Sequence, residues 1–172
     1  MNTLHGEIME VATEGDLSLI KIRAAGQLFH SIVLDTPATS PYLKKDHPVR
    51  LLFKETEVIL AKTDPLQISV RNQVRCRVDK IATGTLLCEL TLSWSDESAK
   101  ATGRTQSTES AHSALAAPLP SDETAGHAGP VPPRHTIRSI ITRNACEQLS
   151  LKENDPVIAL IKTNEVSLSP HD

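Results

Sequence analysis

An internal repeat constrains this chain more than any other feature of its 172 residues. When residues 31–60 are laid over residues 139–168, at an offset of 108, eleven of the thirty positions are identical without a gap. The preceding segment repeats at an offset of 70, which places residues 8–13 on residues 78–83. A repeat of this kind indicates two copies of one small structural unit.

The second copy carries an insert between its halves. The two offsets differ by 108 − 70 = 38 residues, and between Ser95 and Pro130 the chain has no Ile, Val, Phe, Tyr or Trp. A segment of this composition cannot bury enough apolar surface to offset the entropy of ordering it. We therefore expect a disordered insert at 95–134, joining two strands that the tight turn at residues 24–27 joins in the first copy.

Short strands account for the rest of each copy. Residues 17–22 and 87–92 alternate apolar and polar side chains, which is typical of a half-buried strand. Residues 144–149 favour a short helix. Further strands are expected at residues 29–33, 49–53 and 57–60, and at residues 137–141, 157–161 and 165–168. The last strand of each set is expected to close its own unit.

These elements predict an all-β fold of two tandem OB-like, five-stranded small barrels, each with a short helix. The first barrel is expected at residues 1–64. The second is expected at residues 65–172, interrupted by the insert. A unit this small buries too little surface to be robust alone, so we also expect association between chains, as a homo-oligomer.

Composition excludes several classes of function. The formal net charge is −3 and the isoelectric point is about 6.2, which argues against a broad surface for nucleic acid or anionic membrane. An OB-type nucleic-acid site would also need stacking aromatic side chains, and the chain has four aromatic residues in all. They are Phe29, Tyr42, Phe53 and Trp94.

Location and catalysis are also limited by what the sequence contains. The N-terminus lacks the basic stretch and apolar run of a signal peptide, and no apolar run is long enough to span a bilayer, so we expect a cytoplasmic protein. The cysteines Cys76, Cys88 and Cys146 are widely spaced and indicate neither a disulfide framework nor a zinc site. No nucleophile elbow, P-loop or dinucleotide motif is present, so we expect no enzyme.

Three runs carry a resemblance to a known family. Residues 69–73 read Ser-Val-Arg-Asn-Gln, residues 139–142 read Ser-Ile-Ile-Thr, and residues 151–163 read Leu-Lys-Glu-Asn-Asp-Pro-Val-Ile-Ala-Leu-Ile-Lys-Thr. In this order they resemble the molybdenum-pterin-binding (Mop) or TOBE domain family. The resemblance covers residues 68–94 and 137–168 well and residues 4–60 more weakly, so the chain looks like a tandem di-Mop arrangement.

The resemblance implies a site for molybdate or tungstate, formed where subunits or tandem units meet. The family's ligands fall here on Ser69, Arg71, Thr142, Lys162 and Thr163. Asn72 is expected to support the site by bracing the entry turn, and Ala145 stands where the family often has a hydroxyl. A larger molybdenum-pterin ligand stays open. No side chain is expected to bind a metal cation directly.

The physics of a tetrahedral dianion agrees with such a ligand set. Its four oxygens only accept hydrogen bonds, so it requires hydroxyl, amide and cationic donors around it. Each hydrogen bond to a charged partner contributes about 1.5–3 kcal/mol, and four or five are enough for binding in the micromolar range or tighter.

The first copy departs from the motif. It has Leu34 and Glu55 at the positions of Thr142 and Thr163, it keeps Lys54 at the position of Lys162, and no Ser-x-Arg-Asn run precedes its first strand. A glutamate beside an oxyanion is repulsive, so we expect the first copy to contribute scaffold and interface.

Two functions remain from these observations. The first is binding of molybdate or tungstate for intracellular molybdenum storage, buffering or homeostasis. The alternative is an oxyanion-responsive regulatory module that docks on a transporter or regulator protein.

Overall fold

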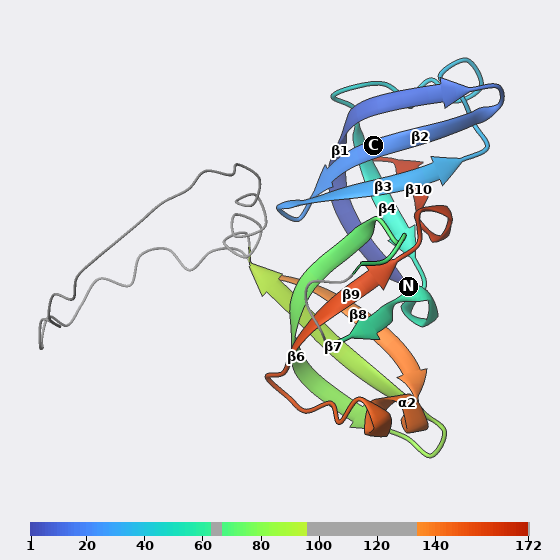
Figure 1. The fold of residues 1–172 in the computed structure, drawn as a ribbon. Helices are drawn as coiled ribbons and strands as arrows, with labels where there is room; N and C mark the ends of the chain where they lie inside the picture. Colours follow the sequence, from blue (N-terminus) through green and yellow to red (C-terminus); the bar gives the residue numbers. More distant parts are fainter. Residues whose placement is uncertain (63–66, 96–133, 172) are drawn as a thin grey trace, which may run out of the picture.

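The structure, a computed structural model, describes residues 1–62, 67–95 and 134–171 (Figure 1). Two curled, antiparallel five-stranded sheets make up the fold, which confirms the expected all-β pair of OB-like barrels. The expected disordered insert lies outside the described residues, apart from its end residues Ser95 and Arg134. Among the described helices, none is long and apolar enough to cross a membrane.

The first sheet has the strand order β10-β4-β1-β2-β3. Its strands are β1 (Asn2–Glu14), β2 (Leu17–Ala24), β3 (Gln27–Val33), β4 (Pro48–Phe53) and β10 (Ser167–Pro170). The second sheet has the order β5-β9-β6-β7-β8. Its strands are β5 (Ile59–Ala61), β6 (Asn72–Thr83), β7 (Leu87–Ser95), β8 (Arg134–Thr142) and β9 (Pro156–Ile161).

Alternation along the strands places the core inside each curled sheet. In β2, Ile20 and Ile22 are fully buried, and in β7, at the same positions of the repeat, Leu90 and Leu92 are fully buried as well. The side chains between them on each strand are more exposed. Aliphatic side chains therefore fill both barrels, as the shortage of aromatic residues requires.

The closing strands are exchanged between the two sheets. The sequence predicts that residues 57–60 and 165–168 each close their own unit, and this is wrong. Instead, β5 pairs with β9 of the second sheet, and β10 pairs with β4 of the first. Figure 1 shows the red β10 at the edge of the first sheet, whose other strands are blue and cyan.

Matched hydrogen bonds hold the two exchanged segments. The buried hydroxyl of Ser31 donates to the carbonyl of Val166 at 2.5 Å, and that of Ser139 donates to the carbonyl of Val58 at 2.8 Å. Both valines are buried. Each exchanged segment begins with a one-turn 3-10 helix: η1 (Glu55–Glu57) packs on β8, and η3 (Thr163–Glu165) packs on β3.

The turn between β2 and β3 shows where the insert enters. Ala25 and Gly26 form it with φ values of 50° and 70°, and the strands pair up to Ala24 and Gln27. The equivalent pair in the second copy is Trp94 with His135. Ser95 and Arg134 therefore hold the positions of Ala25 and Gly26, and the 38 extra residues enter between them.

Matched backbone turns confirm the equivalence of the copies. Asp46 and Asn154 have φ values of 63° and 71° and donate their N–H groups to the carbonyls of Ile8 and Val78 at 2.8 and 2.7 Å. Each of these accepting residues precedes a β-bulge. Asn154 thus takes the left-handed conformation that a glycine would otherwise supply.

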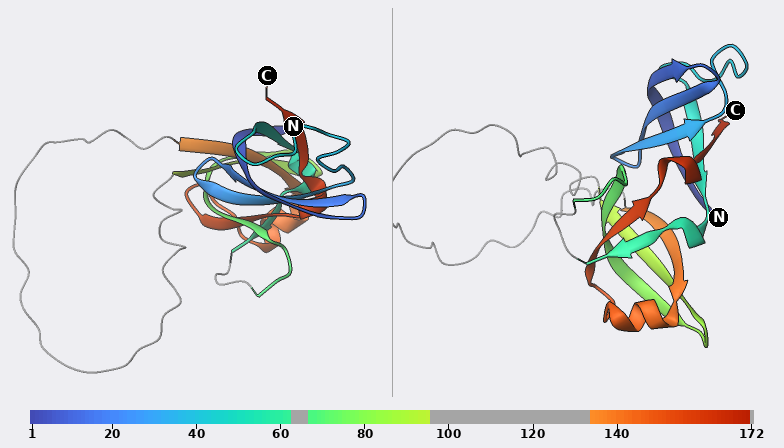
Figure 2. Two further views of the ribbon diagram at one scale, coloured as in Figure 1. Left: turned by 90° about the horizontal axis from the view of Figure 1, so that it is seen from above. Right: turned by 45° about the vertical axis from the view of Figure 1, so that its right-hand side comes forward.

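The short helices differ between the copies. The predicted helix at 144–149 forms as α2 (Arg143–Gln148), at the end of the second sheet farthest from the first (Figure 2). In the first copy the aligned segment forms turns, in which the N–H of Ser40 donates to the carbonyl of Thr36 at 2.8 Å.

Candidate anion-binding site

Four of the five predicted ligand residues lie at one end of the second sheet. Asn72 pairs with Ile161 at the last position of the β6–β9 ladder. Antiparallel pairing therefore places Arg71, just before β6, beside Lys162, just after β9. Ser69 precedes β6 by three residues, and Thr163 begins η3. Three of these four side chains are exposed, and that of Thr163 is half-buried.

Thr142 lies at the opposite end of the same sheet. It pairs with Leu87 at the start of β7, and its hydroxyl accepts the N–H of Ala145 at 3.2 Å as the N-cap of α2. Strand β6 has 12 residues between the two ends, about 36 Å along the strand at about 3.3 Å per residue. Within one chain, Thr142 and Ala145 therefore lie far from the four predicted ligand residues at the other end of the sheet.

Arg71 reaches across to the first sheet. It lines a cleft of about 180 Å³ with residues of β1, β2 and β3. We call this the His30–Arg71 cleft; its lining residues are Glu10, Ala12, Leu19, Lys21, His30 and Arg71. Sequence reasoning missed Lys21 and His30, because they belong to the other copy and to no motif of the resemblance.

Asn72 fixes Arg71 in this place. Its side chain is fully buried, accepts the N–H of His30 at 2.7 Å and donates to the carbonyl of His30 at 2.9 Å. The Asn72 side chain thus braces β3 of the other sheet, and its role in bracing the entry turn stays a prediction. A short amide that replaces a strand partner satisfies both backbone groups of His30.

The electrostatics of the cleft favour an anion. The pKa of His30 is lowered from 6.5, first by burial and then by the charges of Arg71 and Lys21. The Nδ1 atom of His30 is buried and has no hydrogen-bond partner. Glu10 is the one carboxylate that lines this cleft, and Arg71 forms no ion pair with it or with another described residue.

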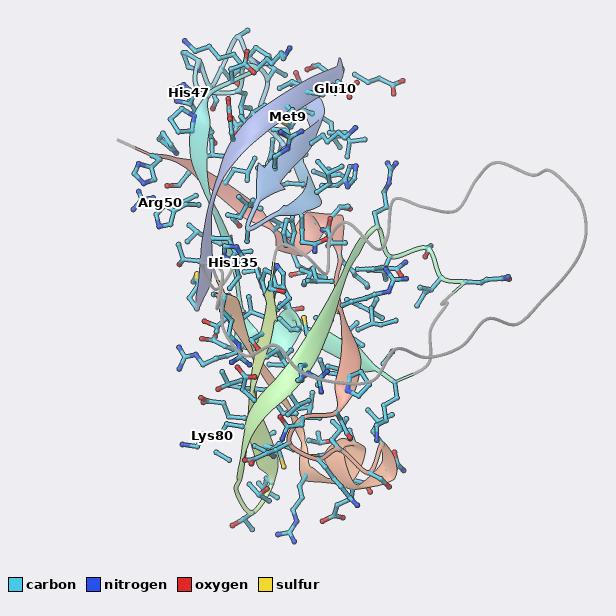
Figure 3. The ribbon with its side chains drawn as sticks, turned by 90° about the vertical axis from the view of Figure 1, so that its left-hand side faces the viewer. Met9, Glu10, His47, Arg50, Lys80 and His135 are labelled. Atoms are coloured by element: carbon cyan, nitrogen blue, oxygen red, sulfur yellow. The ribbon has the colours of Figure 1, made fainter. Side chains whose placement is uncertain are left out.

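A counterpart of the cleft lies in the other half of the molecule. Asn2 repeats the amide clamp: it accepts the N–H of Arg138 at 2.7 Å and donates to the carbonyl of Arg138 at 2.8 Å. Asn2 is thus the equivalent of Asn72, although no Ser-x-Arg run precedes it. Figure 3 shows the equivalent residues Glu10 and Lys80 near opposite ends of the molecule, with His135 between them.

The cysteines and the metal-binding side chain types complete the survey of the described residues. The three cysteines are buried and free, and burial raises the pKa of the Cys76 thiol to about 12. In residues 1–62, 67–95 and 134–171, no group of His, Cys, Asp and Glu side chains could hold a metal cation.

Comparison with known proteins extends the fold assignment. The sequence matches no family model and no curated protein sequence. A solved structure of the cytoplasmic molybdate-binding protein ModG, in a form with molybdate bound, has a TM-score of 0.70 to this chain. The likeness covers 99% of this chain and 96% of that one, at 20% sequence identity. The described part of this chain therefore shares its fold with ModG.

Proposed function

We propose that this chain binds molybdate or tungstate, as a tandem member of the Mop or TOBE family, and holds it for intracellular molybdenum storage, buffering or homeostasis. The observation that carries the proposal is the meeting of Ser69, Arg71, Lys162 and Thr163 at one end of β6 and β9. The likeness to ModG, a molybdate-binding protein, supports the same ligand.

The residues at this end suit a tetrahedral dianion. Two cations, Arg71 and Lys162, supply charge, and two hydroxyls, Ser69 and Thr163, supply further donors. Lys21 adds positive potential on the far side of the cleft, beside the half-buried His30. Such donors act more strongly where part of the surrounding water is excluded.

The distant position of Thr142 suggests how the site is completed. A second copy of the chain could place its Thr142 and α2 against the end of β6 and β9 in the first. We infer a homo-oligomer in which the oxyanion is held between copies. The helix N-terminus at Thr142 would then add donor N–H groups.

Titration calorimetry of the purified chain with molybdate, tungstate and sulfate tests the proposal. We expect saturable binding of molybdate and tungstate and at least tenfold weaker binding of sulfate. Native mass spectrometry of the same samples reports the number of ions and of chains in the complex. Absence of saturable binding of molybdate and tungstate would refute the function.

A further inference from the structure

The counterpart of the His30–Arg71 cleft carries charges of its own. The two offsets of the repeat place Arg138 at the position of His30, Lys54 at that of Lys162 and Glu55 at that of Thr163. The matched amide clamps and the matched serine bonds show that these positions are equivalent in space as well as in sequence.

In the counterpart, the Glu55 carboxylate already forms an ion pair with Arg138. Glu55 Oε1 is 3.2 Å from Arg138 Nη2, and it also accepts a hydrogen bond from the amino group of Met1. Glu89 Oε1 lies 3.6 Å from Arg138 Nη1. The hydrogen bond from the Met1 amino group, together with the charge of Arg138, holds the pKa of Glu55 below its usual value, so Glu55 is charged at neutral pH.

The His30–Arg71 cleft has neither of these carboxylates. Thr163 replaces Glu55, and Leu19 replaces Glu89. Its Arg71 forms no ion pair with a described residue. The two positions therefore share the same backbone, and only the counterpart has carboxylates, those of Glu55 and Glu89, paired with a cation at the position of His30.

We propose that the Glu55 carboxylate fills the counterpart position in place of an oxyanion, so that each chain binds the ion at one of its two equivalent positions. This rests on the proposed function and adds the number of sites and the residue that sets it. The counterpart keeps two of the cations an oxyanion needs, Lys54 and Arg138. A bound dianion beside Glu55 would face its negative charge at close range, which is unfavourable.

Native mass spectrometry with excess molybdate tests the proposal by counting ions per chain. We expect Glu55→Thr to bind one more ion per chain than the wild type, because Thr163 stands at the equivalent position in the second copy. The double variant Glu55→Thr with Lys54→Ala is the matched control and is expected to lose the added ion. In the wild type, Lys54→Ala is expected to leave the number of ions unchanged.

The reciprocal variant gives a second, independent measurement. Thr163→Glu places a carboxylate at the position equivalent to Glu55 and is expected to lower the count by one. Thr163→Ala is expected to weaken binding but keep the count at saturation. If the wild type binds molybdate and folded Glu55→Thr binds the same number of ions per chain, this inference alone is overturned. An unchanged count in Thr163→Glu also overturns it, and a wild type without bound molybdate or tungstate overturns both proposals.

Discussion

The side chain of Asn72 takes the place of a neighbouring strand for His30. It accepts the His30 N–H at 2.7 Å and donates to the His30 carbonyl at 2.9 Å, across the seam between the two sheets. Because Arg71 directly precedes Asn72, this pair of bonds also determines where the Arg71 backbone lies. We therefore expect both the stability and the proposed anion binding to depend on Asn72.

Asn72→Ala should lower the free energy of unfolding by about 2–4 kcal/mol, because it leaves two backbone groups of His30 without partners at a buried position. Urea unfolding followed by circular dichroism measures the change. Asn2→Ala is the matched control, since Asn2 holds Arg138 in the same way. A similar loss of stability is expected in both variants, whereas weaker molybdate binding is expected for Asn72→Ala alone.

The repeat in the sequence predicts the strands, but it could not predict which sheet the closing strands join. Val58 and Val166 are identical, and so are Ser31 and Ser139, whose hydroxyls donate to the carbonyls of these valines. Either closing segment therefore fits either sheet, and connection length and packing decide between them. Strand pairing crosses the proposed boundary between residues 64 and 65 in both directions. The boundary itself stays a prediction.

The candidate site could be predicted in part for a similar reason. The motif residues beside β6 and β9 are close in space because antiparallel pairing brings the start of one strand to the end of the other. Thr142 follows a different strand, and its distance from them depends on sheet topology. His30 and Lys21 come from the other copy, where nothing in their local sequence indicates an anion site.

Arg71→Ala and Lys162→Ala should each weaken molybdate binding by tenfold or more. Each removes a cationic donor, and a charged hydrogen bond contributes about 1.5–3 kcal/mol. Lys54→Ala is the control, because it removes the equivalent lysine of the counterpart, where the Glu55 carboxylate already pairs with Arg138. Titration calorimetry gives the three dissociation constants. Equal and negligible losses in all three variants would contradict the site assignment.

The lowered pKa of His30 predicts a dependence of stability on pH. In the unfolded chain His30 takes up a proton near pH 6.5, whereas in the folded chain it does so only at lower pH. Between these two values the unfolded state binds more protons, so the folded state should lose stability as the pH falls below about 6.5. The loss is complete once the pH is below the folded pKa.

The groups that face His30 allow this effect to be separated from others. Arg71 and Lys21 lower its pKa, while Asn72 and Glu10 raise it. His30→Gln should therefore flatten the stability profile as the pH falls below about 6.5, measured as melting temperature. Saturating molybdate should also reduce the slope in the wild type, because a dianion near Arg71 favours protonated His30. An unchanged slope in His30→Gln would mean that other groups cause the dependence.

Deleting residues 96–133 should leave the fold and its stability intact. The deletion joins Ser95 to Arg134, which hold the positions of Ala25 and Gly26 in the two-residue turn of the first copy. With Ser95→Asn and Arg134→Gly, the new turn has the residues that tolerate a positive φ at both positions. Each halving of loop length also reduces the entropy cost of closure by roughly 0.6 kcal/mol.

The control for this variant removes two residues more on each side, so that Trp94 and His135 are lost as well. Trp94 is 4% exposed, and its indole N–H donates to the carbonyl of Ala25 at 2.9 Å, so its removal opens the core beside the other hairpin. Melting temperature and circular dichroism should show a native-like shorter deletion and a clearly destabilised longer one. An unfolded shorter deletion would show that β7 and β8 need the intervening residues to pair. Unchanged molybdate binding by the shorter variant is expected too, because the deleted residues lie apart from the sequence positions proposed as ligands.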